Sequence, residues 1–127
     1  MTILGNGVDI INNTRIKNAI KNKKFISRIF SKNEILSARR ITNKSNFYAK
    51  RFAAKEAFMK ALGTGNKMIN FSDISIKNLK SGKPKIIITK KIKNLVKKKF
   101  NVNKFNVFLS LSDEKKYSIA YVILNKK

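Results

Sequence analysis

The chain contains no histidine and no cysteine, and its six acidic residues are outnumbered by thirty lysines and arginines. The absence of cysteine excludes a disulfide framework, a zinc–thiolate site and a thiol nucleophile. The absence of histidine leaves carboxylates, lysines, hydroxyl groups, backbone groups or a metal ion to carry out any catalysis. A metal would therefore have oxygen ligands, which favours Mg²⁺ or Mn²⁺ over zinc.

Long apolar runs are also missing. None approaches the roughly 20 residues that cross a bilayer, and the first residues, MTILGNGVDII, lack the basic start and small-residue cleavage site of a signal peptide. We therefore expect a cytoplasmic protein with no membrane-spanning segment. A length of 127 residues with 43% hydrophobic residues predicts one folded domain, residues 1–127.

The net charge of +24 predicts attraction to a polyanion. The partner could be a nucleic acid, a membrane surface, a phosphorylated small molecule or an acidic protein. Lysine, asparagine and isoleucine are abundant along the whole chain, so compositional bias explains the charge equally well. A nucleic-acid surface usually interleaves exposed aromatic residues with the charge, whereas the aromatic residues here fall mainly at core positions. Nucleic acid is therefore not expected, and a small basic RNA-binding domain is an alternative supported only by charge.

The hydrophobic pattern predicts an α+β fold, in which a mainly antiparallel sheet packs on a long, buried central helix. Expected helices cover about 14–20, 31–41, 46–62 and 92–100, and expected strands cover about 2–11, 73–79, 85–89, 105–111 and 117–124. Gly5 and Gly7 are expected to break the first strand. Ser45 is the expected N-cap of the central helix, and Gly63 fits the left-handed position at its end.

The central helix ends in the sequence RFAAKEAFMKALGTG, residues 51–65, which carries Glu56 and Lys60 within an apolar run. Two explanations stay open. A glutamate four residues before a lysine forms a favourable surface pair worth ~0.2–0.5 kcal/mol. However, Phe52 and Ala53 lie on the same face, which indicates that the face is partly buried. Burying a carboxylate is costly unless it is paired or bound to a cation.

Asp9, between apolar neighbours near the end of the first strand, also has two explanations. It could be a turn or cap residue before the next helix, or it could join Glu56 as a ligand of one divalent cation. Spacing in the sequence does not show whether the two carboxylates meet. Glu34 needs no such role, because Ser31 and Glu34 match a capping box at a helix start.

Together these segments resemble the bacterial holo-acyl-carrier-protein synthases of the 4′-phosphopantetheinyl transferase superfamily. Residues 7–10, GVDI, resemble the family's N-terminal G-x-D motif. Residues 51–61 resemble its central (F/W)-A-A-K-E-A-x-x-K signature, and residues 63–65 continue it. Residues 82–84 resemble a G-x-P turn, and residues 109–112 resemble a late S-x-S strand. The order, the spacings and the total length agree from end to end.

The resemblance implies an enzyme that transfers 4′-phosphopantetheine from coenzyme A to a serine of apo acyl carrier protein, in fatty acid biosynthesis. Adenosine 3′,5′-bisphosphate would be released. Asp9 and Glu56 match the Mg²⁺ ligands, and Glu56 and Lys60 match the catalytic residues. The matches to the coenzyme A site are Arg51, Lys60, Thr64, Gly82, Lys83 and Pro84. The resemblance also implies a homotrimer with active sites between subunits, and a basic surface for the acidic carrier protein that includes Arg15, Lys21, Lys24 and Arg28.

One position departs from the family pattern. The family usually has histidine after the S-x-S strand, and this chain has Asp113. A cationic contact from that position to a phosphate of coenzyme A is not expected, unless a nearby lysine such as Lys115 compensates. A catalytically inactive relative that only binds the nucleotide is a further alternative, against which the intact Asp9, Glu56 and Lys60 argue.

Overall fold

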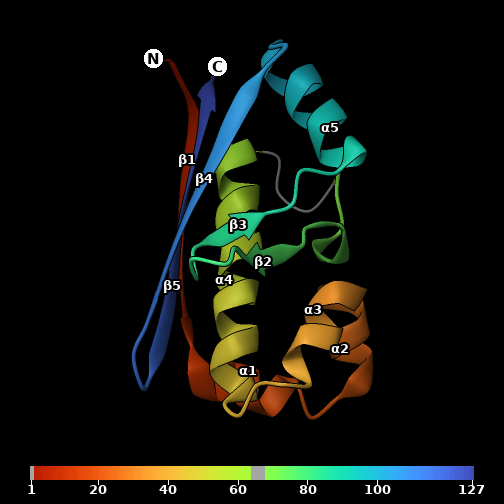
Figure 1. The fold of residues 1–127 in the computed structure, drawn as a ribbon, viewed down its shortest axis with the longest axis vertical. Helices are drawn as coiled ribbons and strands as arrows, with labels where there is room; N and C mark the ends of the chain where they lie inside the picture. The colour runs from red at the N-terminus through yellow and green to blue at the C-terminus, as the bar shows by residue number, and fades with distance from the viewer. Residues whose placement is uncertain (1, 64–67) are drawn as a thin grey trace.

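The computed structural model describes residues 2–63 and 68–127 and shows the expected α+β architecture. Its elements are β1 (Thr2–Asn12), α1 (Asn13–Ala19), α2 (Lys23–Ile29), α3 (Lys32–Ala38), α4 (Lys44–Leu62), the 3₁₀ turn η2 (Phe71–Asp73), β2 (Ile76–Asn78), β3 (Pro84–Ile86), α5 (Lys90–Phe100), β4 (Phe105–Asp113) and β5 (Tyr117–Lys126). An antiparallel sheet has the order β1-β5-β4, and β2 and β3 form a separate hairpin. Helix α4 lies along one face of the larger sheet, with α1 to α3 at one end and α5 at the other (Figure 1).

Helix α4 is the centre of the core. Its buried side chains surround the helix, as expected for a helix enclosed on several sides. The predicted N-cap was wrong: the Asn43 side chain accepts a hydrogen bond from the Asn46 amide at 3.1 Å, and the Ser45 hydroxyl donates to Asn43. The helix therefore begins two residues earlier than expected. Gly63 ends it with a φ of 75°, which confirms the predicted left-handed position.

Strand β1 is continuous, so the prediction that Gly5 and Gly7 break it was wrong. It pairs with β5 along its length, with one register shift between Ile3 and Gly5. The two glycines lie where β1 crosses α4, and a Cβ atom at Gly5 or Gly7 would overlap the carbonyl oxygen of Ala61 or Ala57. Glycine is needed here because the strand and helix backbones touch.

Replacing Gly7 by alanine should therefore destabilise the fold by about 1–3 kcal/mol, the usual effect of overpacking a core. Urea unfolding measures the loss. Asn6→Ala is the matched control, because Asn6 is the preceding residue of the strand and is exposed. Equal stability of the two variants would show that β1 can move away from α4 without cost.

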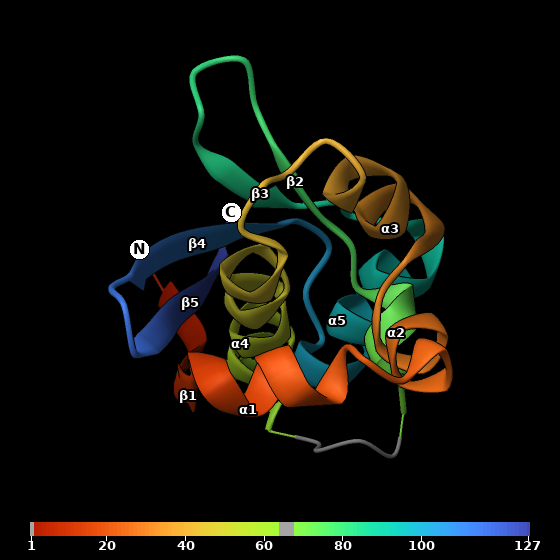
Figure 2. The same ribbon diagram turned by 90° about the horizontal axis from the view of Figure 1, so that it is seen from below.

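The β2–β3 hairpin is shorter than predicted. Residues 71–73 form a 3₁₀ turn, because the Asp73 carboxylate accepts a hydrogen bond from the Asn70 amide at 3.1 Å. The same carboxylate accepts a hydrogen bond from the Lys91 ammonium at 2.8 Å. Thr89 is the N-cap of α5 and cannot also extend β3. The connecting turn has Gly82 at a φ of 89° and projects from the body of the molecule (Figure 2). None of the helices in the described ranges is long and apolar enough to cross a membrane.

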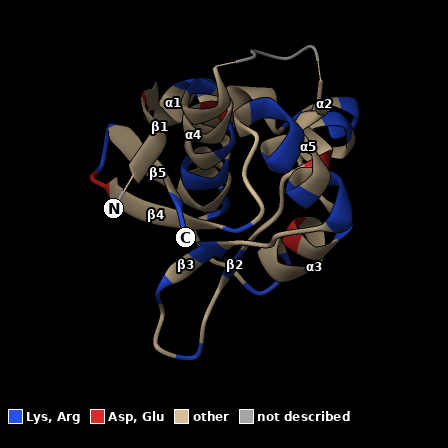
Figure 3. Ribbon diagram, turned by 90° about the horizontal axis from the view of Figure 1, so that it is seen from above, with Lys and Arg blue, Asp and Glu red and all other residues tan. Residues whose placement is uncertain are grey.

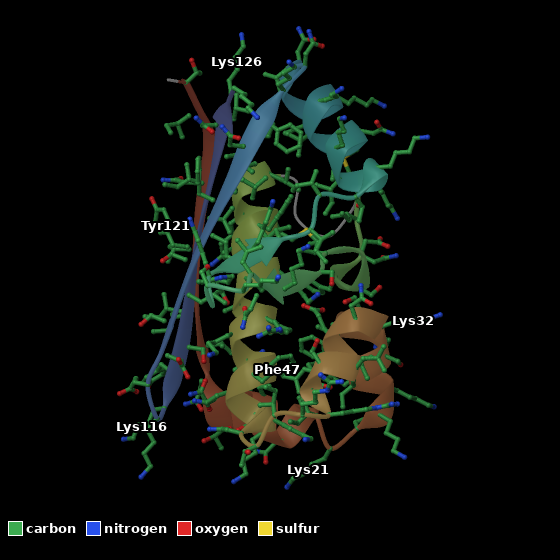
Figure 4. The ribbon with its side chains drawn as sticks, in the orientation of Figure 1. Lys21, Lys32, Phe47, Lys116, Tyr121 and Lys126 are labelled. Atoms are coloured by element: carbon green, nitrogen blue, oxygen red, sulfur yellow. The ribbon has the colours of Figure 1, made fainter. Side chains whose placement is uncertain are left out.

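The face of the sheet that points away from α4 is open in the single chain. Val8 and Ile10 of β1 are 51% and 60% exposed, and they pair with Tyr121 and Ile119 of β5, which are 40% and 39% exposed. Figure 4 shows Tyr121 on the side of the sheet away from α4. Such a row of large apolar side chains marks a surface for association. We refer to Val8, Ile10, Ile119 and Tyr121 as the open sheet face.

Candidate active site

Asp9, Glu56 and Lys60 meet where β1 crosses α4. The Lys60 ammonium donates to Asp9 Oδ1 at 3.2 Å and to the carbonyl oxygen of Val8 at 2.9 Å. In the described parts of the chain, no ion pair joins Lys60 to Glu56. The surface pair within the helix is therefore not the contact that forms, and Lys60 bridges from the helix to the strand.

Asp9 is close enough to Glu56 for its charge to affect the protonation of that carboxylate. Partial burial raises the pKa of Glu56, and the negative charge of Asp9 raises it further, while Lys60 and Arg15 act in the opposite direction. Burial also raises the pKa of Asp9, and the hydrogen bond and charge of Lys60 oppose that shift. Two like charges that share a half-buried site favour a bound cation. The charge of Asp9 thus acts on Glu56, and the convergence of the two carboxylates on one cation stays a prediction.

Glu56 differs from the other five acidic residues in its contacts. The others each have a partner: Asp9 with Lys60, Glu34 with Lys55, Asp73 with Lys91, Asp113 with Asn46 and Lys50, and Glu114 with the Lys116 amide. For Glu56, residues 2–63 and 68–127 supply neither an ion pair nor a hydrogen bond. Its oxygens are therefore available to a ligand from outside the described structure.

The donor set suits Mg²⁺. Histidine and cysteine are absent, and no group of three or more acidic residues gathers anywhere in the described ranges. Asp9 and Glu56 would thus supply two carboxylates, and the other positions would be left to water and substrate oxygens. Mg²⁺ in phosphate chemistry is usually held in this way, by one or two carboxylates together with phosphate groups.

The residues predicted to bind coenzyme A do not all lie at the crossing of β1 and α4. Arg51 is buried, and its guanidinium lies 3.7 Å from the centre of the Phe47 ring, with Nε left without a hydrogen-bond partner. Burial lowers the pKa of Arg51, an effect that the charge of Glu34 opposes. Its role in coenzyme A binding stays a prediction. Thr64 lies outside the described residues.

The residues of the G-x-P turn, 82–84, lie at a second place in the fold. Lys83 and Pro84 line a small cavity of about 210 Å³ between the hairpin and β4, together with Phe108 and Leu109. The turn packs against β4 at one edge of the sheet, whereas Asp9 lies on β1 at the opposite edge. One chain therefore presents two separate parts of the predicted site.

The predicted partner-binding residues Arg15, Lys21, Lys24 and Arg28 are exposed on α1, α2 and the turn between them. Figure 3 shows basic residues on both helices, and Figure 4 shows Lys21 at the same end of the molecule as α1.

Beside this basic surface lies a groove that was not predicted from the sequence. Its volume is about 470 Å³, and its lining residues are Asn22, Lys24, Phe25, Arg28, Ile29, Phe52 and Phe71. Phe25 stacks on Phe52 with ring centres 6.3 Å apart, and both rings are half-buried. Phe52 precedes Glu56 by one helical turn, so the groove adjoins the carboxylate site. In the sequence, the signal was an aromatic residue, Phe25, within the basic segment, whereas its pairing with Phe52 depends on the fold.

Asp113, at the position where histidine was expected, is engaged in the fold. Its carboxylate accepts a hydrogen bond from the Asn46 side chain at 3.0 Å and lies 3.6 Å from the Lys50 ammonium. The aspartate therefore ties the end of β4 to the first turns of α4, and its negative charge is balanced by Lys50. Lys115 is exposed in the turn that follows.

Comparison with known proteins gives a consistent result. A family model described as the 4′-phosphopantetheinyl transferase superfamily matches residues 5–122. The holo-[acyl-carrier-protein] synthase of Pelagibacter ubique is 61% identical over 128 residues, which cover 100% of both chains. The same enzyme of Ehrlichia ruminantium (strain Gardel) is 42% identical, with 98% of both chains covered.

Two solved structures agree in fold. The holo-(acyl-carrier-protein) synthase of Bacillus anthracis in complex with CoA (3′,5′-ADP) is 35% identical, covers 100% of both chains and has a TM-score of 0.82. The holo-[acyl-carrier-protein] synthase of Neisseria meningitidis is 33% identical, covers 98% of this chain and 99% of its own, and has a TM-score of 0.86.

Proposed function

The chain belongs to the 4′-phosphopantetheinyl transferase superfamily, and we propose that it transfers 4′-phosphopantetheine from coenzyme A to a serine of apo acyl carrier protein. The observation that carries this proposal is the meeting of Asp9 on β1 with Glu56 and Lys60 on α4, which lie far from Asp9 in the sequence. A Mg²⁺ requirement, a cytoplasmic location and a role in fatty acid biosynthesis are parts of the same proposal.

Phosphoryl transfer depends mainly on positioning and on neutralising charge. In the proposed reaction the serine oxygen forms a bond to phosphorus, and the bond from phosphorus to the oxygen of adenosine 3′,5′-bisphosphate breaks. Lys60 donates a hydrogen bond to the departing phosphate oxygen. The serine proton passes to a water that Glu56 orients, because the chain has no histidine base. Asp9 and Glu56 would hold Mg²⁺, which when bound neutralises the negative charge of the pyrophosphate.

A direct experiment tests the function. Apo acyl carrier protein is mixed with coenzyme A, Mg²⁺ and the chain, and the carrier protein should gain ~340 Da, the mass of the phosphopantetheine group. Coenzyme A binding without any gain in mass would instead indicate an inactive nucleotide-binding relative. Salt-dependent RNA binding with no response to Mg²⁺ or coenzyme A would favour an RNA-binding domain.

The basic surface and the adjoining groove suit the acidic carrier protein. Cationic side chains would steer the acidic carrier protein, and the rings of Phe25 and Phe52 would contact an apolar side chain from it. This arrangement would bring the carrier serine to Glu56, one helical turn along α4.

Lys24→Glu should accordingly raise the KM for the carrier protein several-fold and leave the KM for coenzyme A unchanged, because Lys24 lines the groove. Steady-state kinetics with each substrate varied in turn measures both constants. Lys98→Glu on α5 makes the same charge change on a separate helix. An unchanged KM for the carrier protein, or the same rise in both variants, would reject this docking surface.

We further propose that the chain forms a homotrimer through the open sheet face, with coenzyme A bound between subunits. Burying this face would remove exposed apolar surface from water. It would also let one subunit bring its turn at Gly82–Pro84 to the Asp9 and Glu56 of a neighbour, since the two parts are separate within one chain.

Assembly should depend on salt, because chains that each carry +24 repel one another. The trimer should gain population as ionic strength rises from about 0.01 M to about 0.15 M, where the Debye length falls from about 30 Å to about 8 Å. Light scattering after size exclusion measures the mass. Ile10→Asp should leave a folded monomer at every salt concentration. An oligomeric state that neither salt nor this substitution alters would contradict the proposal.

A further inference from the structure

Lys55, which precedes Glu56 in the central motif, has no role in the chemistry described above, yet its side chain is 0% exposed. Its ammonium donates to Glu34 Oε1 at 2.7 Å, to the carbonyl oxygen of Phe71 at 3.0 Å, and to the carbonyl oxygen of Ile74. These contacts use all three donors of the ammonium group. A buried lysine with this many fixed partners holds its neighbours in place.

Glu34, the partner of Lys55, is also 0% exposed and fully engaged. Its Oε1 accepts a hydrogen bond from the Ser31 amide at 2.9 Å, as the capping box predicts. Its Oε2 accepts from the Ile76 amide at 3.1 Å, where β2 begins. Glu34 therefore has a second role that the sequence did not indicate.

The pair joins α4 to the segment that leads into the hairpin. Lys55 holds the carbonyl groups of residues 71 and 74, and Glu34 holds the amide of residue 76. The neighbouring Ser75 carbonyl accepts from the Ile87 amide at 2.8 Å, which fixes the returning strand as well. Figures 1 and 2 show β2 and β3 lying across α4, with the turn that contains Gly82 projecting beyond them.

We infer that Lys55 is a positioning residue, which with Glu34 sets the place of the Gly82–Pro84 turn on the body of its own subunit, from which the turn reaches the coenzyme A site between subunits. This inference rests on the proposed function, because it assigns the turn to coenzyme A binding. A buried ion pair is poor evidence for net stability, since apolar or neutral replacements are often as stable. Its value here is geometric: it fixes the hairpin, whose turn binds coenzyme A, to helix α4 of the same subunit.

The test compares Lys55→Met with the double variant Glu34→Gln/Lys55→Met. The single variant leaves an unpaired buried carboxylate and should be much less stable. The double variant removes both charges and should recover most of the lost thermal stability. It should still show a KM for coenzyme A raised on the order of tenfold, because a small misplacement of a binding element is enough for such a loss.

A second measurement does not depend on activity. Amide hydrogen exchange should become faster at Ile76 and Ile87 in the double variant, because their anchor is lost. Lys91→Met is the matched control, since it removes another ion pair of the same segment, Lys91 with Asp73 at 2.8 Å, on the surface. It should leave the KM for coenzyme A and both exchange rates unchanged.

Each outcome has a separate meaning. Faster exchange with an unchanged KM for coenzyme A would overturn the positioning role. So would the unfolding of both variants at the assay temperature, which would make the pair a determinant of global stability. A wild-type chain that fails to modify the carrier protein would count against the proposed function instead, and the exchange rates would still show whether Lys55 fixes the hairpin.

Discussion

Glu56→Gln should reduce kcat by roughly 10²–10³-fold or more while leaving the fold intact. The amide is a weaker metal ligand and cannot orient water as a carboxylate does. Stability should not fall, because Glu56 raises the charge density beside Asp9 and its pKa is raised by burial and by that charge. At neutral pH the substitution therefore relieves repulsion. Kinetics at saturating Mg²⁺ and thermal unfolding measure the two effects.

The raised carboxyl pKa values also give a direction for the pH profile. Asp9 and Glu56 must be deprotonated to hold a cation, and both pKa values lie above the ordinary value of about 4. Activity should therefore fall with acidification at a higher pH than ordinary carboxylates would require.

For the Glu56→Gln prediction, Glu114→Gln is the matched control, because Glu114 is an exposed acid in the β4–β5 turn. Full activity of Glu56→Gln in saturating Mg²⁺ would refute the proposed role of Glu56.

Lys60→Met should lower kcat by a similar factor, roughly 10²–10³-fold, because it removes the hydrogen-bond donor to the departing phosphate. The loss of stability should be small. The Lys60 side chain is 54% exposed, and exposed ion pairs contribute about 0–1 kcal/mol. The measurement is kcat at saturating substrates, together with the thermal midpoint.

Lys50→Met supplies the control for this prediction. Lys50 is also on α4 and also pairs with an aspartate of a strand, Asp113, at 3.6 Å. However, Asp113 is the last residue of β4 and is not one of the proposed metal ligands. Its loss should cost a comparable small amount of stability and much less activity. Equal activity losses in the two variants would mean that Lys60 acts only through the ion pair and not on the phosphate.

Local patterns in the sequence predicted much of the fold. The helix enclosed by apolar residues, the capping box at Ser31 and the glycine at the end of α4 each depend on neighbours along the chain. The error at Gly5 and Gly7 arose because a distant element, α4, decides why glycine is needed there. The errors in the hairpin came from local caps instead: Asp73 caps the Asn70 amide in a 3₁₀ turn, and Thr89 caps the start of α5.

The candidate site could be predicted in composition but not in geometry. The motifs pointed to Asp9, Glu56 and Lys60, whereas spacing favoured a pair between Glu56 and Lys60 on the helix surface. The pairing of Lys60 with Asp9 depends on how a strand and a helix cross, which no local pattern encodes. The same is true of the buried contact between Glu34 and Lys55, 21 residues apart.

The glycines at the crossing of β1 and α4 have a further consequence, for the entropy of binding. With Gly5 and Gly7 against the carbonyl groups of two alanines, no side-chain torsion lies between the strand and the helix. The spacing between the Asp9 and Glu56 backbones is thus settled during folding, and the associated loss of conformational freedom is already complete when substrate arrives. Of the three groups, the half-exposed Lys60 retains the most rotamers to lose. The backbones that carry the proposed metal ligands form a rigid template, and the lysine proposed to bind phosphate is the adaptable part.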